Sequence, residues 1–198
     1  MGSRFKLPIA SQENDLMIIQ SIEIYTLDVP LLKPLKIAIG MRSAVKNIAL
    51  KIVTDTGLVG WGEASPSRYI TGDTAETAYQ AAQLIALQIL GKNPLAIENR
   101  MAEIKSFIAG EPSIRCAFDL ALYDIAAKAA NMPLYQYLGG ELVTTEGKLR
   151  VLRTDLTIGL QDTVEKTVEE AQQILDQNFD AIKMKVGRLG LADVAHVA

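Results

Sequence analysis

The period of the hydrophobic pattern changes twice along this chain, and the order of the changes restricts the possible folds. Residues 17–63 alternate apolar and polar side chains in short runs, which predicts strands. Residues 73–130 repeat apolar side chains every three or four positions, which predicts helices. Residues 149–186 then read as strand, helix and strand, the order of a βαβ unit with a parallel pair. The chain is therefore expected to be an α+β domain followed by the start of an α/β structure.

The first region predicts an antiparallel meander of about three strands. One strand covers residues 17–25 and is expected to stop near Pro30, and a second short strand covers 35–39. A turn containing Gly57 joins the runs 47–53 and 58–63 as a hairpin. Residues 1–16 are mixed and polar, so we expect a disordered leader outside the fold.

Three helices are expected next. Asp73 is the predicted cap of the first, with Glu76 at the capping-box position. Pro94 is expected to open the second helix, and Pro112 the third, which runs to residue 130. After residue 140 we expect a strand over 149–158, a helix capped by Asp162, and a strand over 179–186. The apolar stripe of that last helix is predicted to consist of four residues: Val164, Val168, Ala171 and Leu175.

Composition excludes several classes of protein. The 198 residues hold 20 Lys and Arg against 23 Asp and Glu, a net charge of −3, so a nucleic-acid partner is not expected. No apolar run is long enough for a membrane span. The single cysteine cannot form an internal disulfide, which favours the reducing cytoplasm. The single histidine, His196, excludes a His-rich metal site.

The strand around Lys183 and Lys185 is the most informative candidate site. Because a strand has a period of two, both lysines share one face while Ile182 and Met184 share the other. Two ammonium groups side by side in a partly dry pocket repel each other and resist charging, which would make one of them a usable general base. A surface strand with solvated lysines explains the same pattern, so the residues alone leave both interpretations open.

Two other stretches carry weaker signals. Residues 60–73 contain a strand end and a loop rich in glycine and proline, which could simply connect two elements or could close over a ligand. Residues 153–158 place threonine and aspartate on a strand that could be a solvated face or a pocket wall. Neither pattern decides between its two interpretations.

Taken together, these stretches resemble the enolase superfamily, and within its muconate-lactonizing subgroup most closely the dipeptide epimerases of the L-Ala-D/L-Glu type. The resemblance spans residues 17–187 without a break, and its motifs occur in order along the sequence. They are Pro30-Leu-Leu-Lys-Pro-Leu-Lys36, Val59-Gly-Trp-Gly-Glu-Ala-Ser-Pro66, Ile70-Thr-Gly-Asp73, Ala121-Leu-Tyr-Asp124, Met132-Pro-Leu-Tyr-Gln-Tyr-Leu-Gly-Gly140, Thr154-Asp-Leu-Thr157 and Lys183-Met-Lys-Val-Gly187.

The resemblance implies a capping domain over residues 17–140, made of a meander and a helical bundle, followed over 141–198 by the start of a TIM-type (β/α) barrel. In such enzymes Mg²⁺, held by three barrel carboxylates, binds the substrate carboxylate. One lysine removes the α-proton to give an enediolate stabilised by the metal, and a second lysine returns a proton to the opposite face. The Thr-Asp-x-Thr strand and the Ile-Thr-Gly-Asp loop favour dipeptides over muconate as substrates.

Carried over residue by residue, the resemblance makes Lys185 the base and Lys183 its neighbour that contacts the substrate carboxylate. Thr157 becomes a substrate contact, and so do Ile70 and Thr71, which lie in one of two loops, 36–42 and 65–72, expected to cover the site. A cycloisomerase of the muconate type and a relative of o-succinylbenzoate synthase are the alternative activities within the superfamily.

The chain departs from the family after Gly187. A whole barrel needs about 250 residues, and the carboxylate-bearing strands and second lysine expected there are not found. Residues 188–198 instead resemble a segment near the end of such a barrel, so we expect an internal deletion with its junction near Gly187–Arg188. The expectation is therefore an inactive chain without metal ligands, whose uncovered strand edges favour a homo-oligomer. A non-catalytic capping fragment that only self-associates and an unrelated α+β binding module are the remaining alternatives.

Overall fold

The computed structural model describes residues 5–6, 17–37, 40–187 and 193–197. The chain divides into two compact units, and each is treated by itself below. The first unit comprises Met1–Val29 and Val45–Leu142, and the second comprises Pro30–Ala44 and Val143–Ala198. Residues 30–44, which we expected inside the capping domain, thus group with the second unit. None of the described helices has the length and apolar character needed to cross a membrane.

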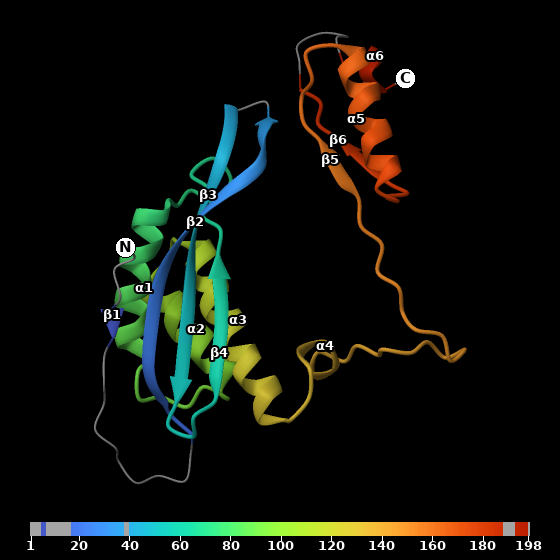
Figure 1. Cartoon of the computed structure of the whole chain (residues 1–198). Coiled ribbons are helices and arrows are strands. Elements are labelled where there is room, and N and C mark those ends of the chain that lie inside the picture. The colour runs from blue at the N-terminus through green and yellow to red at the C-terminus, as the bar shows by residue number, and fades with distance from the viewer. Residues whose placement is uncertain (1–4, 7–16, 38–39, 188–192, 198) are drawn as a thin grey trace. The chain divides into compact units, whose positions relative to one another are not determined.

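The sheet has the strand order β1–β2–β3–β4, and the first unit contains β2 up to Val29 and β3 from Val45 onward. Its main strands are β2 (Ile19–Ile37), β3 (Gly40–Thr54) and β4 (Val59–Ala64), and they lie side by side in chain order as the predicted meander requires (Figure 1). β3 and β4 pair antiparallel. Gly57 in the turn between them has a φ of 84°, a conformation that glycine adopts without strain.

Two strand predictions in this region are wrong, because residues 19–25 and 35–37 belong to one strand and not to two. β2 does not stop at Pro30 but continues to Ile37. Its neighbour β1 (Phe5–Lys6) pairs only with Ile24 and Glu23, so at Pro30 one side of β2 has no neighbouring strand among the described residues, and a missing N–H is tolerated at such an edge. β1 itself lies in the expected leader, so the leader is not wholly outside the fold. Residues 1–4 and 7–16 lie outside the described residues.

Three helices follow β4: α1 (Ala75–Ile89), α2 (Ile97–Phe107) and α3 (Pro112–Ala129). Thr74, not Asp73, caps α1, because the Thr74 hydroxyl accepts the N–H of Thr77 while the Thr77 hydroxyl accepts the N–H of Thr74. α2 begins three residues after Pro94, since a turn separates them. Pro112 opens α3 as predicted. A short helix, α4 (Leu134–Tyr137), was not predicted.

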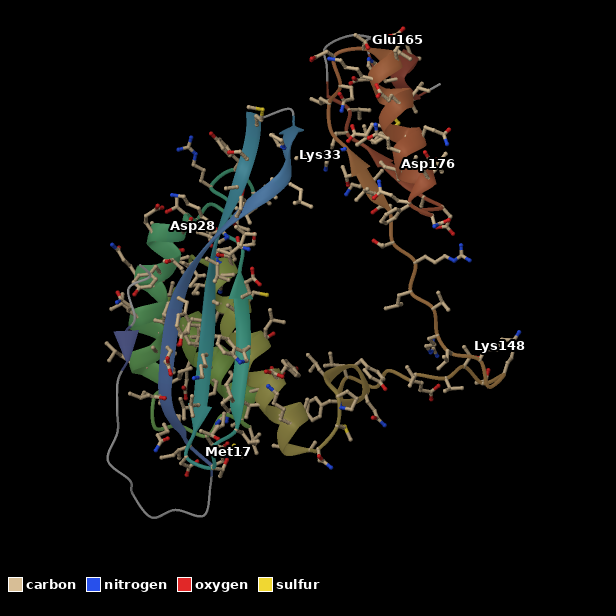
Figure 2. All side chains as sticks on the ribbon, viewed as in Figure 1. Met17, Asp28, Lys33, Lys148, Glu165 and Asp176 are labelled. Carbon is tan, nitrogen blue, oxygen red and sulfur yellow. The ribbon has the colours of Figure 1, made fainter. Side chains whose placement is uncertain are left out.

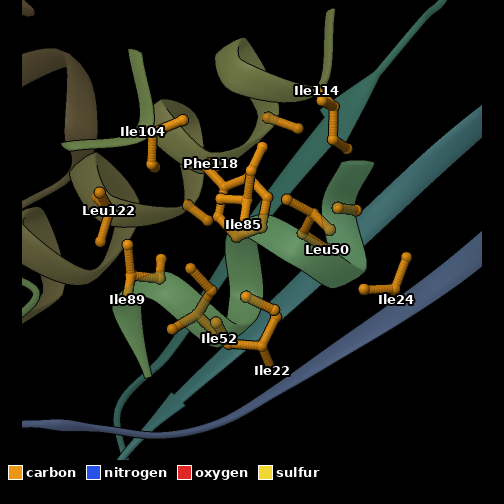
Figure 3. Packing of buried hydrophobic residues seen from close by; sticks show 14 of the residues in the cluster. Ile22, Ile24, Leu50, Ile52, Ile85, Ile89, Ile104, Ile114, Phe118 and Leu122 are labelled. Carbon is orange, nitrogen blue, oxygen red and sulfur yellow. The ribbon is translucent and has the colours of Figure 1, made fainter. Parts of the chain in front are cut away.

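The core of the first unit lies between one face of the sheet and the three helices (Figures 1 and 3). Ten of its large members are fully buried and labelled in Figure 3: Ile22, Ile24, Leu50, Ile52, Ile85, Ile89, Ile104, Ile114, Phe118 and Leu122. α3 packs directly on β4, where Gly60 and Gly62 present no side chain to the helix. The approach is close because a Cβ on Gly62 would lie 1.8 Å from the carbonyl oxygen of Ala117.

The second unit contains the predicted βαβ arrangement. β5 (Leu156–Ile158) and β6 (Ile182–Met184) form a parallel pair, connected by α5 (Val164–Asp176), and α6 (Val194–Val197) contacts α5. Both strands are shorter than predicted, because β5 and β6 pair at only three positions. The expected junction at Gly187–Arg188 lies where the described residues stop, because 188–192 are outside them.

α5 buries a face shifted from the predicted stripe, of which only Val164 and Ala171 are half-buried. Its buried residues are Thr167 and Ile174, whereas Val168 is 62% exposed and Leu175 49% exposed. Thr163, rather than Asp162, caps the helix by accepting the N–H of Lys166. Glu165 in the first turn and Asp176 at the last helical position mark the ends of α5 in Figure 2.

Candidate functional site

The second unit brings three of the predicted site residues to one face of the β5–β6 pair. Thr157 lies directly opposite Lys183 in the parallel register. Lys185 follows β6, and its backbone N–H still donates to the carbonyl oxygen of Ile158 at 3.0 Å. Because side chains alternate along a strand, Lys183, Lys185 and Thr157 occupy one face of this pair. The Lys183 side chain is exposed and Lys185 is half-buried.

The other face of the pair packs against α5. Ile158 is buried there, and Ile182 and Met184 are half-buried. The alternation along β6 explains the arrangement: Ile182 and Met184 lie on the same face of the pair as Ile158, and the lysines are left on the opposite face. Two lysines and one threonine therefore share one face of the β5–β6 pair.

The loop that carries Ile70 and Thr71 belongs to the first unit. The carbonyl oxygen of Ser67 accepts three backbone N–H groups, from Ile70 at 2.9 Å, Thr71 at 2.8 Å and Gly72 at 3.1 Å. The Thr71 hydroxyl accepts the N–H of Ser67 at 2.9 Å and donates to the carboxylate of Asp73. Thr71 is thus engaged within the loop, whereas Ile70 is 79% exposed and available for contact.

Asp73 is the functional candidate that sequence reasoning missed. Its pKa lies below the ordinary 3.8: burial alone would raise it, but hydrogen bonds from the hydroxyls of Ser113 and Thr71 and from the N–H groups of Ser113 and Ser67 outweigh that effect. An aspartate directly before a helix is typical of an N-cap, and this pattern led to the wrong assignment. Thr74 and Thr77 form a capping box without Asp73, and this threonine pair in the sequence could have indicated that Asp73 has another role.

Most of the second expected loop, residues 36–42, belongs to strands. Lys36 and Ile37 end β2, residues 40–42 begin β3, and 38–39 lie outside the described residues. The sequence pattern missed this since Pro30 and Pro34 indicated breaks that the strand tolerates.

No group of three or more His, Cys, Asp or Glu residues able to hold a metal ion occurs in the part of the chain that the structure describes. Such a group would be needed to hold the Mg²⁺ ion that the resemblance implies. Asp155, beside β5, is the only acidic residue of the predicted Thr-Asp-x-Thr strand, and one carboxylate does not make a Mg²⁺ site.

Comparison with known proteins now decides the family. Residues 21–139 match the mandelate racemase / muconate lactonizing enzyme family, N-terminal domain. The chain belongs to this family. The mandelate racemase and muconate lactonizing enzyme domain covers β2 to α4, that is, the meander and the helices described above.

Curated relatives of the chain include dipeptide epimerases of the enolase superfamily. The chain is 35% identical over 181 residues to a D-Ala-D/L-Ala epimerase from Cytophaga hutchinsonii, and 34% identical over 183 residues to an L-Ala-D/L-Glu epimerase from Bacillus subtilis. These matches cover 91% of this chain but 47% and 48% of the two relatives. The chain thus spans about half the length of the curated relatives it matches.

Solved structures agree with this assignment. A dipeptide epimerase from Cytophaga hutchinsonii, complexed with Mg and the dipeptide D-Ala-L-Val, superposes with a TM-score of 0.83 at 32% identity, covering 92% of this chain and 47% of that one. A substrate-liganded L-Ala-D/L-Glu epimerase from Bacillus subtilis superposes with a TM-score of 0.82 at 34% identity, covering 91% of this chain and 48% of that one. The capping-domain fold is therefore that of enolase-superfamily proteins.

Proposed function

We propose that this chain carries the capping domain and the base-bearing strand of a dipeptide epimerase. The observation that supports the proposal is the common face of Thr157, Lys183 and Lys185 on β5–β6, in a chain whose relatives epimerise dipeptides. In this proposal Lys185 is the base, Lys183 contacts the substrate carboxylate, and Thr157 contacts the substrate beside it.

The chemistry assigned to these residues is a proton transfer at one carbon. The free amine of Lys185 takes the α-proton of the dipeptide and becomes an ammonium ion, while the electron pair of the C–H bond stays on the substrate. The positive charge of Lys183 attracts the substrate carboxylate and holds the α-carbon near Lys185. Return of a proton to the opposite face inverts the carbon, and the described residues of this chain are not assigned that second step.

In the same proposal the loop 65–72 selects the substrate. Ile70 would contact a dipeptide side chain, since it is exposed and the loop backbone around it is closed by hydrogen bonds to Ser67. Thr71 would act by holding that backbone, because its hydroxyl already bonds Ser67 and Asp73.

We further propose that the 198-residue chain by itself does not turn over dipeptides. The described residues offer no metal-binding group, and the chain spans about half of its relatives. Measured by NMR in D₂O with L-Ala-L-Glu and a small dipeptide panel, α-proton exchange is expected to be absent with Mg²⁺ and with EDTA alike. Mg²⁺-dependent exchange by this chain would contradict the proposed inactivity.

A chimera tests the role of Lys185 directly. Residues 1–187 joined to the C-terminal half of the Bacillus subtilis relative should exchange the α-proton of L-Ala-L-Glu, and Lys185→Ala should lower the rate by at least about 100-fold, as expected for loss of a general base. Lys166→Ala, on the exposed side of α5, is the matched control and should leave the rate unchanged. Exchange that survives Lys185→Ala in a folded chimera would overturn the assignment.

Self-association is a second candidate, favoured by one observation. Val168 and Leu175 project from α5 with more than two-fifths of each side chain exposed. Val168 and Leu175 are seven residues apart and therefore lie on the same face of the helix. Exposed apolar side chains on one face favour burial against another molecule. A homo-oligomer sealed by this face should dissociate in Val168→Gln/Leu175→Gln, measured by sedimentation velocity. A monomeric wild-type chain would exclude it.

A further inference from the structure

Asp73 holds two elements at once with its two carboxylate oxygens. The side chain is almost fully buried, with 1% of the residue exposed. Oδ1 accepts the N–H of Ser67 at 3.3 Å and the hydroxyl of Thr71. Oδ2 accepts the N–H of Ser113 at 3.2 Å and the hydroxyl of the same residue. One oxygen therefore serves the loop 65–72, and the other serves the beginning of α3.

The beginning of α3 depends on this contact. Its own N-cap residue, Glu111, has a φ of 55° and makes no side-chain capping bond. Ser113 is the second residue of the helix, so its N–H has no acceptor within α3. Asp73 supplies that acceptor from a position 40 residues earlier in the chain. The carboxylate thus caps α3 from outside.

The other side of Asp73 fixes the loop. Ser67 and Thr71 are bonded to each other as well as to the carboxylate, and the N–H groups of residues 70–72 all point to the Ser67 carbonyl oxygen. Ile70 lies at this closed turn with its side chain exposed. The backbone position of Ile70 is therefore tied through Asp73 to the beginning of α3.

We propose that Asp73 is a positioning residue, which locks residues 67–72 onto α3 and so sets where Ile70 meets the substrate. The substrate contact of Ile70 rests on the proposed function, whereas the lock itself does not. A carboxylate suits this place better than an amide, because four donors converge on it and a carboxylate accepts without donating. An asparagine would turn its own N–H₂ group toward those donors.

Amide hydrogen exchange of the full chain tests the lock. In Asp73→Asn, the amides of Ile70, Thr71 and Gly72 should exchange at least about tenfold faster than in the wild type. Amides of the β3–β4 pairing serve as the internal reference and should keep their rates. Unchanged exchange at residues 70–72 in this variant would overturn the proposal. The measurement contains no substrate, so failure of the epimerase assignment would leave its outcome untouched.

Variants of Thr71 and Ser113 separate the two sides of the lock and cover the case in which Asp73→Asn does not fold. Thr71→Val removes the hydroxyl at nearly constant volume and should accelerate exchange at residues 70–72, while Thr71→Ser keeps the hydroxyl and should restore wild-type rates. Ser113→Ala should accelerate exchange in the first turn of α3 more than in the loop. Equal rates in Thr71→Val and Thr71→Ser would contradict the proposal.

Discussion

Replacing Gly62 by alanine should disrupt the contact between β4 and α3. The added Cβ would lie 1.8 Å from the carbonyl oxygen of Ala117 and 2.8 Å from its carbonyl carbon. Both atoms belong to helix backbone, so no side chain can rotate away. To reach even 3.0 Å, below which Cβ contacts essentially do not occur, the helix must retreat by about 1.2 Å, the difference between 3.0 and 1.8 Å.

Such a displacement lowers the free energy of unfolding strongly, because it separates α3 from β4 along their whole contact. A radial gap of about 0.5–1 Å already loses a quarter to a half of the dispersion energy of each contact. Phe118 and Leu122 on α3 are fully buried against the sheet and would lose contacts together. We expect Gly62→Ala to lower the free energy of unfolding by about 3 kcal/mol, the upper end of the typical cost of overpacking.

Urea unfolding measures this loss, and Trp61, the only tryptophan, provides the signal from the neighbouring position on β4. Gly110→Ala is the matched control, since a Cβ there meets nothing within 4 Å. The control should stay within about 1 kcal/mol of the wild type. A loss below about 1 kcal/mol in Gly62→Ala would refute the close-packing argument.

Three carboxylates give further predictions. Asp124→Ala should cost about 1 kcal/mol in urea unfolding, because the N–H of Trp61 at 2.9 Å loses its acceptor on the edge of β4. The folded-state pKa of Asp73 is lowered, so the carboxylate stabilises the fold above pH 3.8, and this stabilisation should be lost as the pH falls through the folded-state pKa. Asp73→Asn should remove this part of the acid dependence of the urea midpoint. Burial and the charge of Glu98 raise the pKa of Asp119, so ionisation of this carboxyl destabilises the fold. Stability should therefore fall as the pH rises through the raised pKa, and the fall should be smaller in Asp119→Asn.

The order of the elements could be predicted from the sequence because hydrophobic period is a local property. Alternation over 47–53 and 58–63 gave β3 and β4, the three-to-four spacing gave α1 to α3, and the strand–helix–strand order gave the parallel pair β5–β6. The common face of Lys183 and Lys185 followed from the same local rule. These features need no knowledge of distant residues.

Boundaries and buried faces needed the tertiary structure. Proline interrupts a strand where a neighbouring strand needs a hydrogen bond from its N–H. Among the described residues, β2 has no neighbouring strand on one side at Pro30, so no such hydrogen bond is lost. α5 buries Thr167 and Ile174 rather than Val168 and Leu175, since the packing against β5 selects the face and the periodicity fits both. A helical period specifies a helix but not its rotation about its own axis.

The sequence alone thus determined the element types, their order and the pairing of two lysines on one strand face, because each depends on residues close together in the chain. Only the tertiary structure decided what Asp73 does. Its partners Ser67 and Thr71 are near in sequence, but Ser113 is 40 residues away, and the carboxylate becomes a shared acceptor only when α3 packs beside the loop. The local pattern predicted that Asp73 caps α1, whereas in the folded chain it caps α3.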